Sequence, residues 1–237
     1  MPPPTIKNKQ GCSCRPLQRR REPDGTLVPA GGYGSFPWHG AARFAAQILV
    51  QRWCIMLRGF SIINGESRQG SGGTFTGIDP ATGAQLDPPY HYASMDDLAL
   101  AAGLAEEAFA SYSKLPGRER ARLLRRIAAG MESIAAEIVE RAHRETALPE
   151  ARLKGELART VNQLRLFAEV VEDGSWANAR IDPAEPERKP LPRADIRSVL
   201  RPLGPVAVFG SSNFPLAFSV AGGDTASALA AGNPVIV

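Results

Sequence analysis

Cysteine is scarce in this 237-residue chain, and its distribution limits the chemistry that the chain can perform. The three cysteines, Cys12, Cys14 and Cys54, all lie in the first quarter of the sequence. The Cys-Ser-Cys pair lacks the second pair of ligands found in zinc-binding spacings, and the three histidines form no ligand spacing either. We therefore expect unpaired thiols and no metal site.

Long apolar runs are also absent. The most apolar stretch, residues 44–56, is interrupted by two glutamines and Arg52, and it is shorter than the roughly 20 residues of a membrane span. The first twenty residues lack the apolar core of a secretory signal. Glu22 and Asp24 depart from the acid-poor pattern of organellar transit peptides. We expect a soluble, cytoplasmic protein with no membrane partner.

Acidic residues are rare only at the start of the chain. Up to Phe60 there are nine basic residues and two acidic ones, whereas the remaining chain has 19 basic and 22 acidic residues. The net charge of +4 therefore comes from the leading segment. A nucleic-acid-binding domain needs a basic face with base-stacking aromatics, which Arg19-Arg20-Arg21 alone does not supply. We expect no nucleic-acid partner.

Residues 1–57 are rich in proline and show no sustained hydrophobic period. Such a segment cannot bury enough apolar surface to offset the entropy of ordering, so we expect it to be disordered. The composition and the hydrophobic pattern of the sequence change near Met56. We hypothesise that Met56 is the real initiator and that the preceding residues reflect an error of gene prediction; a native peptide from before Met56 would contradict this.

Strand and turn signals begin at residue 60. Residues 60–63 look like a strand that enters an Asn64-Gly65 turn. Residues 72–78 then look like the returning strand, and residues 79–83 form a further turn in which proline and glycine occupy favoured positions.

Three helices are predicted next. Ser94, followed by two aspartates, predicts the capped start of a helix that runs to Tyr112. A second helix is predicted from about Arg118 to Arg141. A third begins near Pro149 and ends at Gly174.

The last third of the chain predicts an extended arm and a βαβ unit. Four prolines between residues 183 and 192 force extended backbone, and residues 196–200 look like a strand that follows this arm. Residues 206–209 form a short continuous apolar run, as in a fully buried parallel strand. A small-residue helix over 214–231 and a second strand from residue 234 complete the unit. The fold class is therefore α/β with a parallel sheet.

Asn213 lies at the mouth of the first βα loop of this unit, where open α/β sheets place their ligands. An asparagine beside a helix start is also explained by capping. The small residues of the following helix are explained by close packing. The residue types alone leave a ligand site and a structural role open.

Two segments resemble the start of the cofactor domain of aldehyde dehydrogenases. They are Gly-Pro-Val-Ala-Val-Phe-Gly-Ser-Ser-Asn-Phe-Pro-Leu (204–216) and Ala-Gly-Asn-Pro-Val-Ile-Val (231–237). Asp-Pro-Ala-Thr-Gly (79–83) and the three-helix region fit the same family in order and spacing. The resemblance covers roughly residues 58–237 and implies a partial N-terminal cofactor-binding domain.

Further segments resemble one branch of this family, the 2-oxoglutarate semialdehyde (2,5-dioxovalerate) dehydrogenases. They are residues 152–156, 159–160, 163–168, 190–193 and 222–228. This branch implies oxidation of 2-oxoglutarate semialdehyde to 2-oxoglutarate. Residues 176–202 resemble the arm that joins the family's oligomerisation hairpin, which implies a homo-oligomer.

The resemblance implies a thiol-based aldehyde oxidation that uses NAD or NADP. A cysteine thiolate adds to the aldehyde, hydride passes to the cofactor, and water hydrolyses the thioester with help from a glutamate. Asn213 corresponds to the family's oxyanion donor, a kind of group worth about 3 kcal/mol of barrier. Phe209, Gly210, Ser211 and Ser212 match the loop along the nicotinamide side of the cofactor. The residues that discriminate NAD from NADP follow the second strand, so the choice between them cannot be read.

The chain departs from the family because no cysteine follows Cys54. The family's lysine after its second cofactor strand, its glutamate base and most of its catalytic domain would follow Val237. We therefore expect a truncated N-terminal part that is inactive by itself and unstable, because its sheet has an exposed edge. Two alternatives stay open: another aldehyde or acyl-CoA-linked dehydrogenase of the same fold, and a non-catalytic helical interaction module built on residues 94–172.

Overall fold

The computed structural model describes residues 19–21, 27–29 and 57–237. The chain divides into two units, Met1–Ile55 and Met56–Val237. In the first unit, the described residues form two antiparallel strands, β1 (Arg19–Arg21) and β2 (Leu27–Pro29), which the sequence had not indicated. The expectations for the rest of residues 1–56 lie outside the described residues.

Asn64 and Gly65 form the first turn of the second unit. They join β3 (Ser61–Ile63) to the antiparallel β4 (Glu66–Arg68). Both turn residues have positive φ, 52° and 79°, as in the type I′ turn whose twist matches that of a hairpin. The turn was predicted correctly. The prediction that residues 72–78 return from it is wrong, because a two-residue turn brings the chain back at once.

Residues 72–78 contribute instead to a second hairpin. β5 (Thr74–Ile78) pairs antiparallel with β6 (Gln85–His91). The turn predicted over residues 79–83 joins these strands. The backbone N of Gly83 donates to Asp79 O at 2.7 Å, and Gly83 has a φ of 73°.

Two of the three predicted helices form as expected. α2 (Met95–Tyr112) starts at a capping box in which Ser94 and Asp97 exchange hydrogen bonds. α5 (Glu150–Asp173) ends at Gly174, whose left-handed backbone (φ 76°) stops the helix.

The helix predicted over residues 118–141 is two helices. They are α3 (Gly117–Ser133) and α4 (Ala135–Thr146). Ile134 separates them because its backbone (φ −123°, ψ 26°) leaves the helical region. An apolar stripe that continues across the break conceals this kink in the sequence.

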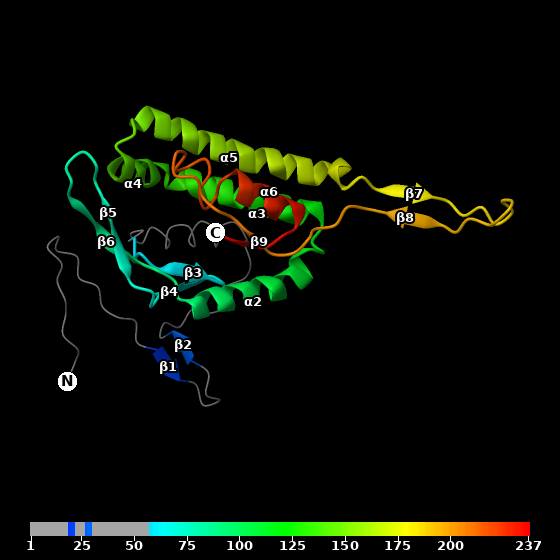
Figure 1. Cartoon of the computed structure of the whole chain (residues 1–237), viewed down its shortest axis with the longest axis horizontal. Helices are drawn as coiled ribbons and strands as arrows, with labels where there is room; N and C mark the ends of the chain where they lie inside the picture. The colour runs from blue at the N-terminus through cyan, green and yellow to red at the C-terminus, as the bar shows by residue number, and fades with distance from the viewer. Residues whose placement is uncertain (1–18, 22–26, 30–56) are drawn as a thin grey trace, which may run out of the picture. The chain divides into compact units, whose positions relative to one another are not determined.

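In the second unit, α3, α4 and α6 (Gly223–Ala231) lie along one side of α5 (Figure 1). One face of α5 is buried at the three- and four-residue spacing of a helix. α3 and α6 pack on this face through one apolar cluster, and α4 packs on it through a second. Gly117 lies so close to α5 that a Cβ there would be 2.3 Å from Val171 O. Only glycine fits this crossing.

The predicted βαβ unit is present. β9 (Val206–Ala207) and β10 (Val235–Ile236) pair in parallel and are joined by α6. Gly232 ends α6 with a left-handed backbone (φ 100°), as predicted. Asn233 Oδ1 accepts hydrogen bonds at 2.9 and 3.1 Å from two backbone N–H groups just before β9. The asparagine after α6 therefore positions the start of the strand.

Two predictions for this unit are wrong. The helix predicted over residues 214–231 begins only at Gly223, because residues 213–222 form turns that α5 holds in place. The run 206–209 is not fully buried. Val208 is buried, but Phe209 is 88% exposed because no described element covers it.

The arm of residues 176–202 forms a two-stranded hairpin (Figure 1). β7 (Arg180–Asp182) follows the short helix η1 (Ser175–Ala177) and pairs antiparallel with β8 (Ile196–Ser198). All six strand residues are exposed. The strand predicted over residues 196–200 is thus shorter than expected and is paired within the arm itself.

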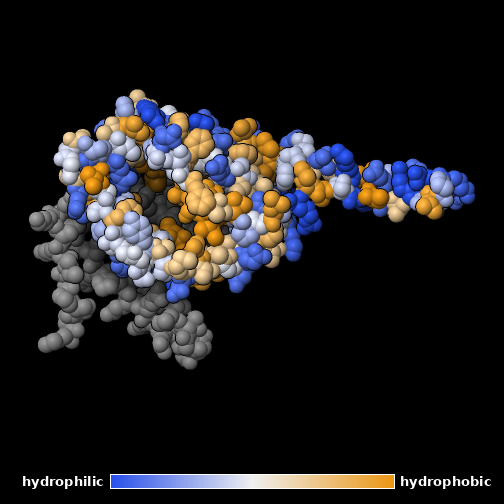
Figure 2. All heavy atoms as spheres, in the orientation of Figure 1, coloured by the Kyte–Doolittle hydropathy of each residue, from blue (hydrophilic) through white to orange (hydrophobic). Residues whose placement is uncertain are grey.

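Apolar side chains lie at the surface of the helices and of the arm, among the polar ones (Figure 2). Across the described residues, every helix is too short or too polar to cross a membrane.

Candidate functional site

The loop after β9 contains all five residues predicted for the site. They are Phe209, Gly210, Ser211, Ser212 and Asn213, and all are exposed. The backbone turns at this loop, where Ser211 N donates to Phe218 O at 2.8 Å. The loop lies at the carboxyl end of a parallel strand, which is the usual ligand position in open α/β sheets.

A hydrogen bond orients the Asn213 side chain. Its Oδ1 accepts a hydrogen bond from Ser211 Oγ, which leaves Nδ2 without an acceptor within residues 57–237. The side chain therefore presents N–H groups rather than a carbonyl oxygen. The capping explanation for Asn213 is wrong, because α6 starts at Gly223 with Gly222 as its cap.

Three side chains on one face of α5 hold Asn213, at the end of the loop, and Leu216, which follows it. Arg152 Nη2 donates to Asn213 O at 2.8 Å, and Arg152 Nε donates to Glu156 Oε1 at 3.1 Å. Glu156 Oε2 accepts from Leu216 N at 3.2 Å, and Thr160 Oγ1 donates to Leu216 O at 2.7 Å. Because both backbone groups of Leu216 are bonded to α5, they are not available for the helix predicted there.

Two aromatic rings of the same segment lie under guanidinium groups of α5. The Arg152 guanidinium carbon is 5.7 Å from the ring centroid of Phe214, and that of Arg159 is 5.1 Å from the ring centroid of Phe218. The two rings meet edge to face at 5.7 Å. The segment after Asn213 is therefore fixed to α5 by charge, hydrogen bonds and stacking together.

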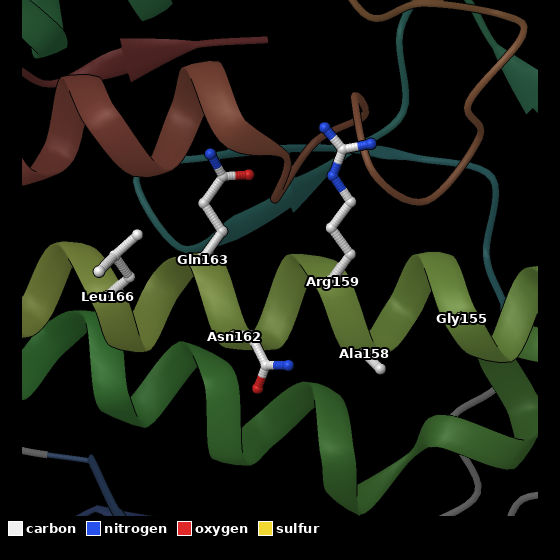
Figure 3. A pocket seen from close by; sticks show the side chains of 6 residues that line it. All are labelled: Gly155, Ala158, Arg159, Asn162, Gln163 and Leu166. Carbon is white, nitrogen blue, oxygen red and sulfur yellow. The ribbon is translucent and has the colours of Figure 1, made fainter.

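A cavity of about 610 Å³ lies along α5 beside this segment. Its lining residues are Gly155, Ala158, Arg159, Asn162, Gln163 and Leu166 (Figure 3). Arg159 and Gln163 extend from the same side of α5 in this view. Gln163 reaches the start of α6, where a Cβ on Gly223 would be 3.0 Å from Gln163 Oε1. All six lining residues belong to α5, so the cavity is an open hollow along the surface of this helix.

No functional role was predicted from the sequence for the residues of α5 that hold the loop. The segments that contain Arg152, Glu156 and Thr160 indicated only a branch of the family. Their four-residue spacing places them on one helical face. Their partners lie 56 to 61 residues further along the chain, however, and a local sequence pattern cannot show such contacts.

The residues that the structure describes contain no group of three or more His, Cys, Asp or Glu side chains placed to hold a metal ion. The chemistry available at the loop is that of an amide donor, two hydroxyl groups and exposed backbone.

The parallel β9–α6–β10 unit, with a ligand-type loop at its carboxyl end, places the second unit in the α/β class. A family model described as "Aldehyde dehydrogenase family" matches residues 67–237. The chain belongs to the aldehyde dehydrogenase family, and the aldehyde dehydrogenase-like fold predicted from the sequence is confirmed.

Individual relatives agree with this assignment. The chain is 53% identical over 184 residues to alpha-ketoglutaric semialdehyde dehydrogenase 2 of Azospirillum brasilense, covering 77% of this chain and 35% of that protein. It is 45% identical over 178 residues to alpha-ketoglutaric semialdehyde dehydrogenase of Acinetobacter baylyi, covering 75% and 34%. The predicted resemblance to this branch is confirmed. The chain spans about a third of the length of these curated relatives.

The fold is similar to those of several solved structures. One is PnpE in complex with nicotinamide adenine dinucleotide, which is 26% identical with a TM-score of 0.63. The similarity covers 76% of this chain and 35% of that one.

Proposed function

We propose that this chain supplies the N-terminal, cofactor-binding part of an NAD(P)-dependent aldehyde dehydrogenase that oxidises 2-oxoglutarate semialdehyde to 2-oxoglutarate. Similarity to two alpha-ketoglutaric semialdehyde dehydrogenases supports the substrate, since the two names denote the same aldehyde. Similarity to PnpE, solved with a nicotinamide dinucleotide, supports the cofactor.

The observation that carries the proposal is the geometry of the loop over residues 209–213. It is exposed, and its residues 210–212 have short side chains, so a flat ring can approach the backbone closely. Asn213 presents its amide N–H groups. In the complete enzyme the cofactor would supply the hydride acceptor, and residues 209–212 would lie along its nicotinamide side.

Asn213 Nδ2 would donate to the aldehyde oxygen as negative charge develops on it. A cysteine thiolate would create that charge by adding to the carbonyl carbon. The three cysteines of this chain all precede the family match, so we place the nucleophile and the glutamate base in the remaining part of the enzyme. The positions of Arg152 and Glu156 fix the Asn213 backbone, so the donor is held in place before substrate binds.

A chimera tests this proposal. Residues 67–237 replace the matching third of the Azospirillum brasilense enzyme, and NADH or NADPH formation is measured with 2-oxoglutarate semialdehyde. We expect activity, and we expect Asn213→Ala to lower kcat about 100-fold or more, which is the effect of losing one oxyanion donor. Gln85→Ala, which removes an exposed amide on β6, is the control and should keep full activity.

The proposal fails if the chimera folds but oxidises no aldehyde, or if Asn213→Ala leaves kcat unchanged. We further propose that the complete enzyme is a homo-oligomer that uses the arm, whose Ile181 and Ile196 side chains are exposed. Sedimentation of the chimera as a monomer would contradict this.

A further inference from the structure

Arg159 is the arginine of α5 that has no acidic partner within residues 57–237. Arg152 pairs with Glu156 at 3.1 Å, and Arg165 pairs with Glu132 at 2.6 Å. Arg159 instead stacks on the ring of Phe218. This contact places the guanidinium group over the ring but uses none of its five N–H donors.

The cavity around Arg159 also lacks negative charge. Its six lining residues include two amides, Asn162 and Gln163, and no carboxylate. A second groove, on α3, is different. It contains several arginines, but Glu119 pairs there with Arg118 and Arg122, and Glu172 pairs with Arg125. Three of the four arginines that line the groove on α3 thus have an acidic partner, whereas Arg159, the one charged residue that lines the cavity on α5, has none within residues 57–237.

A guanidinium group held over an aromatic ring, with an amide beside it, suits a planar anion. The fork of N–H donors matches the two oxygens of a carboxylate and binds it through two parallel hydrogen bonds. The amide N–H groups of Gln163, which extends from the same side of α5 as Arg159 (Figure 3), can donate to the same or a neighbouring oxygen.

The position of Arg159 relative to the loop suits a small substrate. Arg152 donates to the backbone oxygen of Asn213, and Arg159 lies seven residues further along α5. At about 1.5 Å per residue this is about 10 Å along the helix axis. A chain of a few carbon atoms, hydrogen-bonded at one end to Asn213 and at the other to Arg159, spans a distance of this order.

We propose that Arg159 binds the carboxylate of the aldehyde substrate and makes the enzyme select aldehydes that carry a carboxylate a few carbons from the carbonyl group. This inference rests on the proposed function and adds to it the residue that recognises the distal end of the substrate. Phe218 acts as a positioning residue because its ring lies under the guanidinium group.

The test compares two five-carbon aldehydes in the chimera described above. 2-Oxoglutarate semialdehyde carries the carboxylate, and pentanal carries none. We expect Arg159→Gln to raise KM for the semialdehyde about ten-fold or more with a smaller effect on kcat, because a charge-assisted pair to the substrate is lost. The kcat/KM for pentanal should not fall. Arg159→Lys should give an intermediate KM, because lysine keeps the charge but not the fork.

Arg165→Gln is the matched control. It removes an exposed arginine of the same helix outside the cavity, and both substrates should keep their kinetic constants. An equal loss on both aldehydes after Arg159→Gln would show a structural role and overturn the inference, as would no change on either. A chimera that oxidises neither aldehyde would instead contradict the proposed function.

A measurement on the unsubstituted chimera provides an independent check. Glutarate should inhibit competitively against the semialdehyde. The inhibition constant of glutaramide, its neutral counterpart, should be about ten-fold higher or more. Equal inhibition by the two compounds would overturn the inference without reference to any variant.

Discussion

Glu156 connects the helical body to the candidate site through one carboxylate. It is 7% exposed, and its two oxygens accept hydrogen bonds from Arg152 and from the backbone N of Leu216. Removing a buried carboxylate leaves both donors without a partner, which costs more than the net energy of the hydrogen bonds themselves.

We predict that Glu156→Ala lowers the free energy of unfolding of the chain by about 2–3 kcal/mol, the usual cost of losing hydrogen bonds to a charged group. Urea denaturation followed by circular dichroism measures this. Glu156→Gln should lose less, because its amide oxygen still accepts from Leu216 N. Glu150→Ala, which removes an exposed carboxylate paired with Lys154 on the same helix, should leave the midpoint unchanged. Equal midpoints for Glu156→Ala and Glu150→Ala would contradict the role of Glu156.

At this scale the sequence predicted one side of the candidate site and missed the contacts that hold it. The place of Asn213 at the end of a parallel strand followed from the apolar run before it and from the family resemblance. The roles of Arg152, Glu156 and Thr160 did not follow, because charged and hydroxyl residues on a helix are explained equally well by a solvated face. Contacts across 56 to 61 residues become visible only in the fold.

Among the elements, those with a strong local signal were predicted best. The Asn64-Gly65 turn, the cap of α2 at Ser94 and the end of α5 at Gly174 all depend on backbone conformations that these residue types favour. The start of α6 was misplaced by nine residues, because small residues suit a helix locally while contacts with α5 hold residues 213–222 in turns.

Tyr112 links two of these elements. Its hydroxyl group, near the end of α2, donates to Leu229 O of α6 at 2.8 Å. Burial raises the pKa of Tyr112 to about 12 from its ordinary value of 10.0, although the nearby Arg120 opposes the rise. In the folded chain the phenol therefore keeps its proton at a pH where the unfolded chain has lost it.

This raised pKa predicts the direction of an alkaline effect on stability. Below pH 10 the tyrosine is neutral in both states and adds no pH dependence. From pH 10 to about 12 only the unfolded state ionises, so the free energy of unfolding falls as pH rises. Tyr112→Phe should reduce this fall, leaving the part due to Tyr90, whose pKa burial also raises, and should cost about 1 kcal/mol at pH 7 through the lost hydrogen bond. Thermal melts from pH 8 to 12 measure both effects. Tyr92→Phe, at an exposed tyrosine, should keep the alkaline fall, and an unchanged pH profile for Tyr112→Phe would refute the assignment.

For the second unit as a whole, the structure argues against an independent helical module. The buried face of α5 is covered in part by Ala226 and Ala230 of α6, and Thr160 is bonded to Leu216. The helices over residues 94–172 therefore share their core with the chain that leads to β10. The sequence alone left this alternative open, because the apolar stripe of α5 does not reveal which element covers it.

In the proposed reaction, turnover depends on a cysteine nucleophile. The segment that matches the family, residues 67–237, contains no cysteine. An amide donor and a loop for the nicotinamide can stabilise charge but cannot form the thioester on which the proposed reaction depends. We predict that the purified 237-residue chain produces no NADH or NADPH from 2-oxoglutarate semialdehyde, whereas the chimera does so under the same conditions. Adding the chain to the Azospirillum brasilense enzyme should leave that enzyme's rate unchanged, which excludes an inhibitor in the preparation. Aldehyde-dependent turnover by the chain alone that disappears after Cys54→Ala would contradict the prediction and would assign the nucleophile to a cysteine that precedes the family match.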